Sequence, residues 1–207
     1  TGLEYFDIFY SHRYDSTTPI EETMQALIDM VKQGKALYVG LSNYPADKAR
    51  EAMTYLNDQH VPSLIYQGKY SMFNRQPEEE ILPVTSEFGS GFIAFSPLAQ
   101  GVLTDKYLNG IPEQSRAADS TGFLRKEQVT EELVAKVRKL NELARERGQT
   151  MAEMALAWTL RDERVTSVIV GTRNVKQLQD NLESLNNLSF TQEELVLIDN
   201  ILGGATL

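Results

Sequence analysis

The chain has 207 residues, of which 42% are hydrophobic and 24% charged, a composition that is typical of globular proteins and excludes extensive disorder. It has no cysteine, which excludes a disulfide framework, thiolate metal sites and cysteine nucleophiles, and its formal net charge of −9 argues against nucleic acid as the main partner. No apolar run is long enough to span a membrane, and the first residues lack signal-peptide features, so we expect a cytoplasmic protein without a metal site.

Short apolar runs are expected to form β-strands that are covered on both faces. They lie at residues 5–10, 36–39, 63–67, 92–95 and 167–170. Helical periodicity fills the stretches between them and continues to the end of the chain. The expected helices cover residues 20–33, 46–56, 78–88, 131–147, 151–161, 175–185 and 192–202.

Alternating strands and helices predict a parallel sheet with right-handed crossovers in a single α/β domain covering residues 1–207. An open doubly wound sheet and a (β/α)8 barrel both satisfy this order. No G-x-G-x-x-G follows any strand, which weakens the doubly wound alternative. The stretch from Phe95 to about Val129 has no clear element, and a loop of that length indicates a functional lid or partial disorder.

The ends of the first three strands carry polar side chains, and parallel α/β folds gather function at these ends. His12 can donate a hydrogen bond or a proton to a carbonyl oxygen, or it is a polar turn residue. Ser42 and Asn43 can bind a carboxamide or simply form a turn before the next helix. Gln67 can pair with an amide, and Gly68 lets a ligand approach the backbone or only ends the strand. We interpret the second histidine, His60, as an ordinary loop residue on the opposite side.

The last two strand ends suit a flat ring and a phosphate. Phe95 can stack on a ring or belong to the core. Residues 171–174 form a glycine turn into a helix, where Arg173 and Lys176 add charge for a phosphate or act as solvated surface charges. Each signal is weak alone. Together they describe a nicotinamide dinucleotide facing a carbonyl.

These strand ends match, in order, those of the aldo-keto reductase family. Four segments carry the resemblance, at residues 2–15, 34–44, 95–112 and 165–185. The third segment, FSPLAQGVLTDKYLNGIP, resembles the branch of the bacterial L-glyceraldehyde 3-phosphate reductases and the potassium-channel β-subunits. The resemblance implies a (β/α)8 barrel that binds NADPH and reduces small, sometimes phosphorylated, aldehydes such as L-glyceraldehyde 3-phosphate or methylglyoxal. Two alternatives are a cofactor-binding regulatory subunit of the channel type and a catalytically inert chain.

The resemblance also implies roles for individual residues. His12 matches the catalytic histidine, and Phe95 matches an aromatic that stacks on the nicotinamide. The carboxamide binders match Ser42, Asn43 and Gln67. The loop over the pyrophosphate matches Ser96, Leu98, Gln100, Gly101 and Lys106. The adenosine-phosphate end matches Gly171, Arg173, Gln177, Asp180 and Asn181, and Arg173 favours NADPH over NADH.

The strand–helix units of this chain resemble units four to eight of the family's barrel. The family's tyrosine acid, its lysine partner and an aspartate come from the first three units, so no residue here matches them. Five strands cannot close an eight-stranded barrel and would leave open edges and an apolar inner face. We therefore expect this chain to be the C-terminal part of a longer barrel, or to be completed by another copy of itself as a homo-oligomer.

Overall fold

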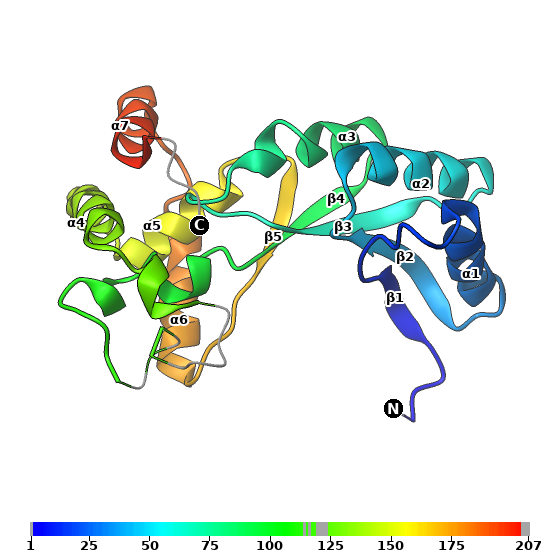
Figure 1. Ribbon diagram of the computed structural model, residues 1–207, viewed down its shortest axis with the longest axis horizontal. Helices are drawn as coiled ribbons and strands as arrows, with labels where there is room; N and C mark the ends of the chain where they lie inside the picture. Colours follow the sequence, from blue (N-terminus) through cyan, green and yellow to red (C-terminus); the bar gives the residue numbers. More distant parts are fainter. Residues whose placement is uncertain (1, 114, 116, 119–123, 204–207) are drawn as a thin grey trace. The chain divides into compact units, whose positions relative to one another are not determined.

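The computed structural model describes residues 2–113, 115, 117–118 and 124–203 (Figure 1). The chain divides into two compact units. The first comprises residues 1–69, 76–94 and 164–167, and the second comprises residues 70–75, 95–163 and 168–207. The expectation of a single domain over residues 1–207 stays a prediction.

The strands of the structure form one five-stranded sheet in the order β1-β2-β3-β4-β5. They are β1 (Phe6–Ser11), β2 (Ala36–Ser42), β3 (Ser63–Lys69), β4 (Gly91–Phe95) and β5 (Val165–Ile169). β1 pairs with β2, and β2 with β3, in parallel. The predicted strands are all present with bounds shifted by a few residues, and sequential order in the sheet follows from the alternation of strands with helices.

In the first unit, α1 (Ile20–Lys32) packs on β1 and β2, and α2 (Ala46–Asp58) packs on β3 and on α1. Figure 1 draws these elements in blue and cyan. The apolar stripe of α1 buries Met24, Leu27 and Ile28 completely or nearly so, and Val39 and Leu41 of β2 are also fully buried. Burial of such aliphatic side chains contributes roughly 1.5–3 kcal/mol each. The sheet is therefore anchored to its helices through one face.

The other face of the sheet is apolar but incompletely covered. Register pairs Ile8 with Tyr38 and brings Tyr10, Gly40 and Ile65 side by side. Tyr38 is 50% exposed, and Ile8, Tyr10 and Ile65 are each partly exposed. A large apolar surface of this kind is uncommon on a closed domain.

The helix predicted over residues 78–88 is wrong in its first part. The structure has a 3-10 turn at Gln76–Glu78 and then α3 (Ile81–Glu87), which packs against α2. Pro83 stands in the first turn of α3, where its missing N–H costs nothing. An α-helix that started earlier would place the proline ring against the carbonyl of Glu79, four residues before it.

The ends of α1 and α2 share one backbone motif. The residue after the C-cap adopts a left-handed conformation, with φ of 70° at Gly34 and 59° at His60. In both helices the N–H groups of that residue and of the next one donate to carbonyls of the last helical turn. His60 is therefore a helix-terminating residue in a conformation that glycine adopts at lower cost.

The second unit contains the remaining helices. They are α4 (Glu131–Glu146), α5 (Met151–Leu160), α6 (Val175–Glu183) and α7 (Gln192–Leu202). α5 is buried on nearly all sides, with Met154, Ala155 and Trp158 fully enclosed. Thr191 and Glu194 form a capping box at the start of α7, because each residue's side chain accepts from the other's backbone N–H.

The long segment after β4 is more structured than its sequence indicates. Short 3-10 turns occur at Ala99–Gly101, Asp105–Tyr107 and Lys126–Gln128. Val102, Leu103 and Tyr107 are buried and anchor the first half of the segment. Residues 115–122, part of the stretch in which we expected a functional lid or partial disorder, lie mostly outside the described residues.

Candidate functional site

His12, Ser42, Asn43 and Gln67 form a group at the carboxyl ends of β1, β2 and β3, which we call the β1–β3 cluster. Ser42 and Gln67 are register partners, and His12 follows directly on β1. The Nδ2 of Asn43 donates to the His12 carbonyl oxygen at 3.2 Å and to the Ser42 hydroxyl oxygen at 2.8 Å. Parallel pairing brings these consecutive strand ends to one edge of the sheet. The structure thus joins the end of β1 to the end of β2 through one amide side chain.

Asn43 stands in the left-handed region, with φ of 53°. Asparagine tolerates this conformation better than most residues, but the conformation persists only where surrounding contacts enforce it. Here the two hydrogen bonds of its amide group supply part of that enforcement. The strained residue therefore has a defined orientation beside His12.

Several hydrogen-bonding atoms of the cluster remain available. Gln67 is half-buried, and its side-chain amide bonds to none of the described residues, nor does the Oδ1 of Asn43. Ser42 is 2% exposed and accepts from Asn43, and its hydroxyl donates to none of the described residues, so this hydrogen is available to a ligand. A carboxamide needs an acceptor for its NH₂ group and a donor for its carbonyl. The residues present fit such a group.

A tyrosine network that the sequence analysis missed surrounds this cluster. The Tyr66 hydroxyl accepts from the Tyr44 backbone N–H at 2.9 Å and donates to the Tyr44 carbonyl oxygen at 2.7 Å. The Tyr44 hydroxyl lies 2.7 Å from the Ser11 hydroxyl. Burial raises the pKa of Tyr66 to about 12 and also raises the pKa of Tyr44. The sequence offered one sign of this network, the tyrosine directly before Gln67 in a predicted strand. Because side chains alternate between the two faces of a strand, that tyrosine points away from the cluster and was missed.

Gly68 has a packing role in this structure. A Cβ on Gly68 would lie 2.8 Å from the Phe92 ring. Phe92 in turn stacks on Tyr66, with ring centroids 5.9 Å apart and planes 14° apart. The glycine makes room for this stack inside the helix-covered face of the sheet.

In the second unit, the residues predicted over a pyrophosphate lie in a tightly turned loop after β4. Left-handed conformations occur at Ser96 (φ 55°), Ala99 (φ 46°) and Gln100 (φ 59°), as well as at Gly101 (φ 98°). The Leu98 carbonyl accepts from the N–H of Gly101 at 2.9 Å. Non-glycine residues in this region gather at functional sites more often than elsewhere. Leu98, Lys106 and the half-buried Phe95 belong to the same segment.

The other predicted group of the second unit lies at the start of α6. Gln177 accepts the Arg173 N–H through its Oε1 at 2.8 Å, and Asn174 caps the helix by accepting the Gln177 N–H at 2.9 Å. Asn174 was absent from the predicted site, although an asparagine before a helical run is a capping signal. Gly171 and Arg173 are exposed, and within the described residues the Arg173 guanidinium pairs with no carboxylate. Asp180 forms an ion pair with Lys176 at 2.8 Å, and Asn181 is half-buried.

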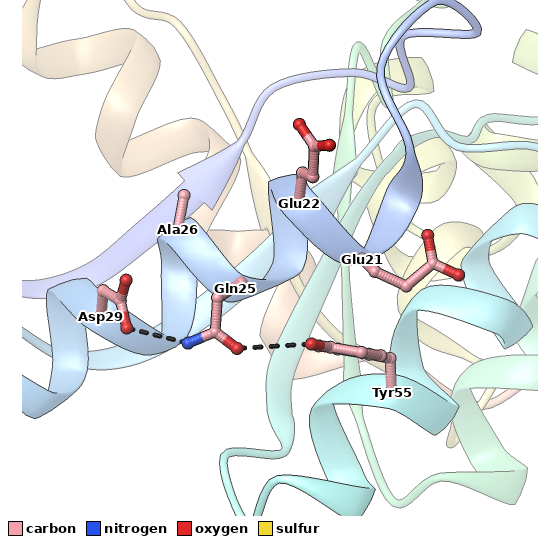
Figure 2. Close-up of a pocket in the computed structure, with 6 residues that line it drawn as sticks. All are labelled: Glu21, Glu22, Gln25, Ala26, Asp29 and Tyr55. Atoms are coloured by element: carbon pink, nitrogen blue, oxygen red, sulfur yellow. Dashed lines mark hydrogen bonds between the residues drawn. The ribbon is translucent and has the colours of Figure 1, made fainter.

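A separate hollow lies between α1 and α2, away from the predicted residues (Figure 2). Glu21, Glu22 and Asp29 give it an acidic lining. Figure 2 shows Tyr55 donating to Gln25, which donates in turn to Asp29. This hollow contains no predicted site residue. No group of residues suited to holding a metal ion is found among those described, and no described helix is both long and apolar enough to cross a membrane.

The chain matches the model of the aldo/keto reductase family over residues 1–202. It is 50% identical over 202 residues to an L-glyceraldehyde 3-phosphate reductase of Escherichia coli O157:H7, and 48% identical over 202 residues to that of strain K12. It is also 36% identical over 198 residues to a probable voltage-gated potassium channel subunit beta of Oryza sativa subsp. japonica. These alignments cover 96%, 96% and 94% of this chain but only 58%, 58% and 60% of the relatives. The chain belongs to the aldo/keto reductase family.

Proposed function

We propose that this chain supplies the cofactor-binding residues and the catalytic histidine of an NADPH-dependent reductase of small aldehydes. The observation that carries the proposal is the β1–β3 cluster, in which His12, Ser42 and Asn43 meet through hydrogen bonds in a member of the aldo/keto reductase family. The names of two relatives favour L-glyceraldehyde 3-phosphate as the substrate. Methylglyoxal is a second candidate of the same chemical class.

The proposed role of the cluster is to bind the nicotinamide carboxamide. Ser42 donates its hydroxyl hydrogen, the Asn43 Oδ1 accepts, and the Gln67 amide can do either. The absence of competing bonds to the Gln67 amide among the described residues supports this assignment. When bound, NADPH supplies the hydride that reduces the aldehyde carbon.

His12 is proposed to orient the aldehyde. Its imidazole is exposed and stands directly after β1, and its own carbonyl is held by Asn43. A ring N–H donated to the carbonyl oxygen polarises the C=O bond and stabilises the negative charge that develops there. The histidine thus prepares the substrate for reduction without changing its own covalent structure.

The second unit is proposed to bind the rest of NADPH. Phe95 is assigned to stack on the nicotinamide ring. The pyrophosphate is assigned to Ser96, Leu98, Gln100, Gly101 and Lys106. The adenosine phosphate is assigned to Gly171, Arg173, Gln177, Asp180 and Asn181. The guanidinium of Arg173 is exposed and pairs with no carboxylate of the described residues, which supports a phosphate ligand, because a planar fork of donors matches phosphate oxygens.

We further propose that the five-stranded sheet is part of a (β/α)8 barrel. The support is the incompletely covered apolar face that carries Ile8, Tyr10, Tyr38 and Ile65. Inward-facing side chains fill the interior of such a barrel, so further strands would bury this face. The additional strands would come either from a longer protein or from another copy of the chain. A measured mass well above the 23.3 kDa of this chain would support the first source, and a stable oligomer would support the second. A cytoplasmic location stays a prediction.

The experiment is NADPH consumption, followed by absorbance, by the full-length protein with L-glyceraldehyde 3-phosphate, methylglyoxal and unphosphorylated glyceraldehyde. We expect turnover, and a preference for NADPH over NADH. An absence of turnover across these aldehydes, together with tight NADPH binding, would contradict the reductase proposal. It would favour the second candidate below.

The second candidate is a regulatory subunit that uses the bound nucleotide as a redox sensor. Its support is the 36% identity to a probable potassium channel subunit beta. It predicts bound nucleotide, very slow turnover and a stable complex with the cytoplasmic part of a channel in a pull-down. A third outcome, no NADPH binding in a fluorescence titration of the 207-residue chain, would identify that chain as inert by itself.

A further inference from the structure

One phenol holds both backbone groups of a neighbouring loop residue. The Tyr66 hydroxyl accepts from the N–H of Tyr44 and donates to its carbonyl oxygen, at 2.9 and 2.7 Å. Tyr44 and Tyr66 are each 4% exposed. Water therefore has little access to replace either bond, and removal of the phenol oxygen would leave two buried backbone groups unpaired.

The phenol ring is itself fixed in place. It stacks on Phe92, which is fully buried. Gly68 leaves room for the Phe92 ring, since a Cβ there would lie 2.8 Å from it. The hydroxyl of Tyr66 is therefore presented to Tyr44 by a packed aromatic pair and not by a mobile side chain.

The loop residue that the phenol holds is next to Asn43. Asn43 has a φ of 53°, and its amide bonds to the His12 carbonyl oxygen and to Ser42. On the other side, the Tyr44 hydroxyl bonds to Ser11, the residue before His12. The loop after β2 is thus tied to the end of β3 by Tyr66 and to the end of β1 by Ser11 and His12.

We propose that Tyr66 is a positioning residue for the nicotinamide end of the cofactor. Its hydroxyl fixes the backbone of Tyr44, and this keeps Asn43 in the left-handed conformation that aims its amide at His12 and the carboxamide. The inference rests on the proposed function and deepens it, because Tyr66 itself touches no substrate or cofactor atom. Burial raises the pKa of Tyr66 to about 12, so the hydroxyl keeps its donated hydrogen throughout the neutral range.

The test is Tyr66→Phe in the full-length protein, which keeps the ring stack and removes only the hydroxyl. Three quantities are measured: the affinity for NADPH, the affinity for adenosine 2′,5′-diphosphate, and the amide hydrogen exchange of Tyr44. We expect NADPH to bind about three- to tenfold more weakly, which is the effect of losing one or two net hydrogen bonds. The adenosine diphosphate lacks the nicotinamide, so its affinity is expected to be unchanged. The Tyr44 amide is expected to exchange faster.

The matched control is Tyr55→Phe. Tyr55 also uses its hydroxyl in a hydrogen bond, to Gln25, but in the hollow between α1 and α2 (Figure 2). This variant is expected to bind both ligands as the wild type does. If Tyr66→Phe does not fold, Ser11→Ala removes the other tether of Tyr44 and is expected to weaken NADPH binding selectively in the same way.

Three outcomes would overturn the proposal. Unchanged NADPH affinity in the folded variant would assign Tyr66 to stability alone. An equal loss of affinity for both ligands would indicate general disruption rather than positioning. A wild type that binds neither ligand would remove the proposed function and the positioning role together, whereas the first two outcomes leave the proposed function standing.

Discussion

The predicted site residues after β1–β3 and those at the start of α6 are held by different kinds of contact. In the β1–β3 cluster, Asn43 bonds to its neighbour Ser42, but the other hydrogen bonds of Asn43, Tyr44 and Tyr66 join residues 22 to 33 positions apart in the chain. At α6, the bonds of Arg173, Lys176 and Gln177 join residues 3 or 4 positions apart. The first region is organised by tertiary structure, and the second by local sequence.

This difference has consequences for ligand binding. The tyrosine network of the first region is largely buried and held by hydrogen bonds before a ligand binds. Ligand binding therefore requires little loss of conformational entropy there. The second region is exposed, and an exposed ion pair such as that of Lys176 with Asp180 contributes only about 0–1 kcal/mol. We therefore expect the α6 group to rearrange readily around a phosphate, whereas the β1–β3 cluster presents a preformed surface.

The largest effect is expected for His12→Ala. Loss of its ring N–H should lower the kcat of aldehyde reduction by the full-length protein about 10²–10⁴-fold, because the carbonyl oxygen loses its donor. NADPH affinity should change little. The control is His60→Asn, which replaces the helix-terminating histidine with a residue that tolerates its left-handed φ of 59°. Unchanged kcat in His12→Ala would remove this residue from the catalytic proposal.

A smaller effect is expected from the buried Tyr66 as pH rises. Its pKa is raised from 10.0 to about 12 in the folded state, so the folded protein resists its ionisation. The stability contributed is complete below pH 10 and is lost as pH rises toward 12, by about 2 kcal/mol. Urea unfolding of wild type and Tyr66→Phe between pH 9 and pH 11.5, roughly spanning this window, should show a steeper decline in the wild type. Parallel declines would show that other groups control alkaline stability.

Arg173→Ala probes the exposed region. Removal of a guanidinium that contacts phosphate should weaken NADPH binding about tenfold and leave NADH binding unchanged. The free energy of unfolding should stay the same, since Arg173 is exposed. Lys176→Ala is the matched comparison: because its ammonium is already paired with Asp180, we expect this variant to weaken NADPH binding less than Arg173→Ala does. Equal weakening of NADPH and NADH would argue against a contact with the additional phosphate.

The smallest effect is a gain in stability at the end of α2. His60→Gly should raise the free energy of unfolding by up to about 1 kcal/mol, because glycine adopts a left-handed φ without strain. The equivalent position of α1 already holds Gly34. Thermal unfolding of the variant measures the gain, and the kinetic constants should not change. A destabilised variant would show that the His60 side chain contributes packing that the backbone geometry does not reveal.

The candidate site was predictable to different extents in the two regions. The capping of α7 and the turn before α6 follow from neighbouring residues, so the sequence predicts them well. The fold class followed from the alternation of strands and helices, whereas α3 was misplaced because Pro83 restricts where its first turn begins. His12, Ser42, Asn43 and Gln67 were named from their places after strands, but their mutual contacts were not predictable.

The sequence by itself determined the order of elements, most of their bounds and the residue types at the strand ends, because these depend on periodicity and local capping. Only the tertiary structure decided that the Tyr66 hydroxyl bonds to the Tyr44 backbone and that the Asn43 amide donates to the His12 carbonyl oxygen. It also decided that Gly68 leaves room for the Phe92 ring. These contacts join residues far apart in the chain, and each exists only after parallel strands have paired in one register. No local sequence pattern encodes such contacts. The family resemblance therefore identifies the candidate site residues, whereas tertiary packing determines which contacts hold those residues in position.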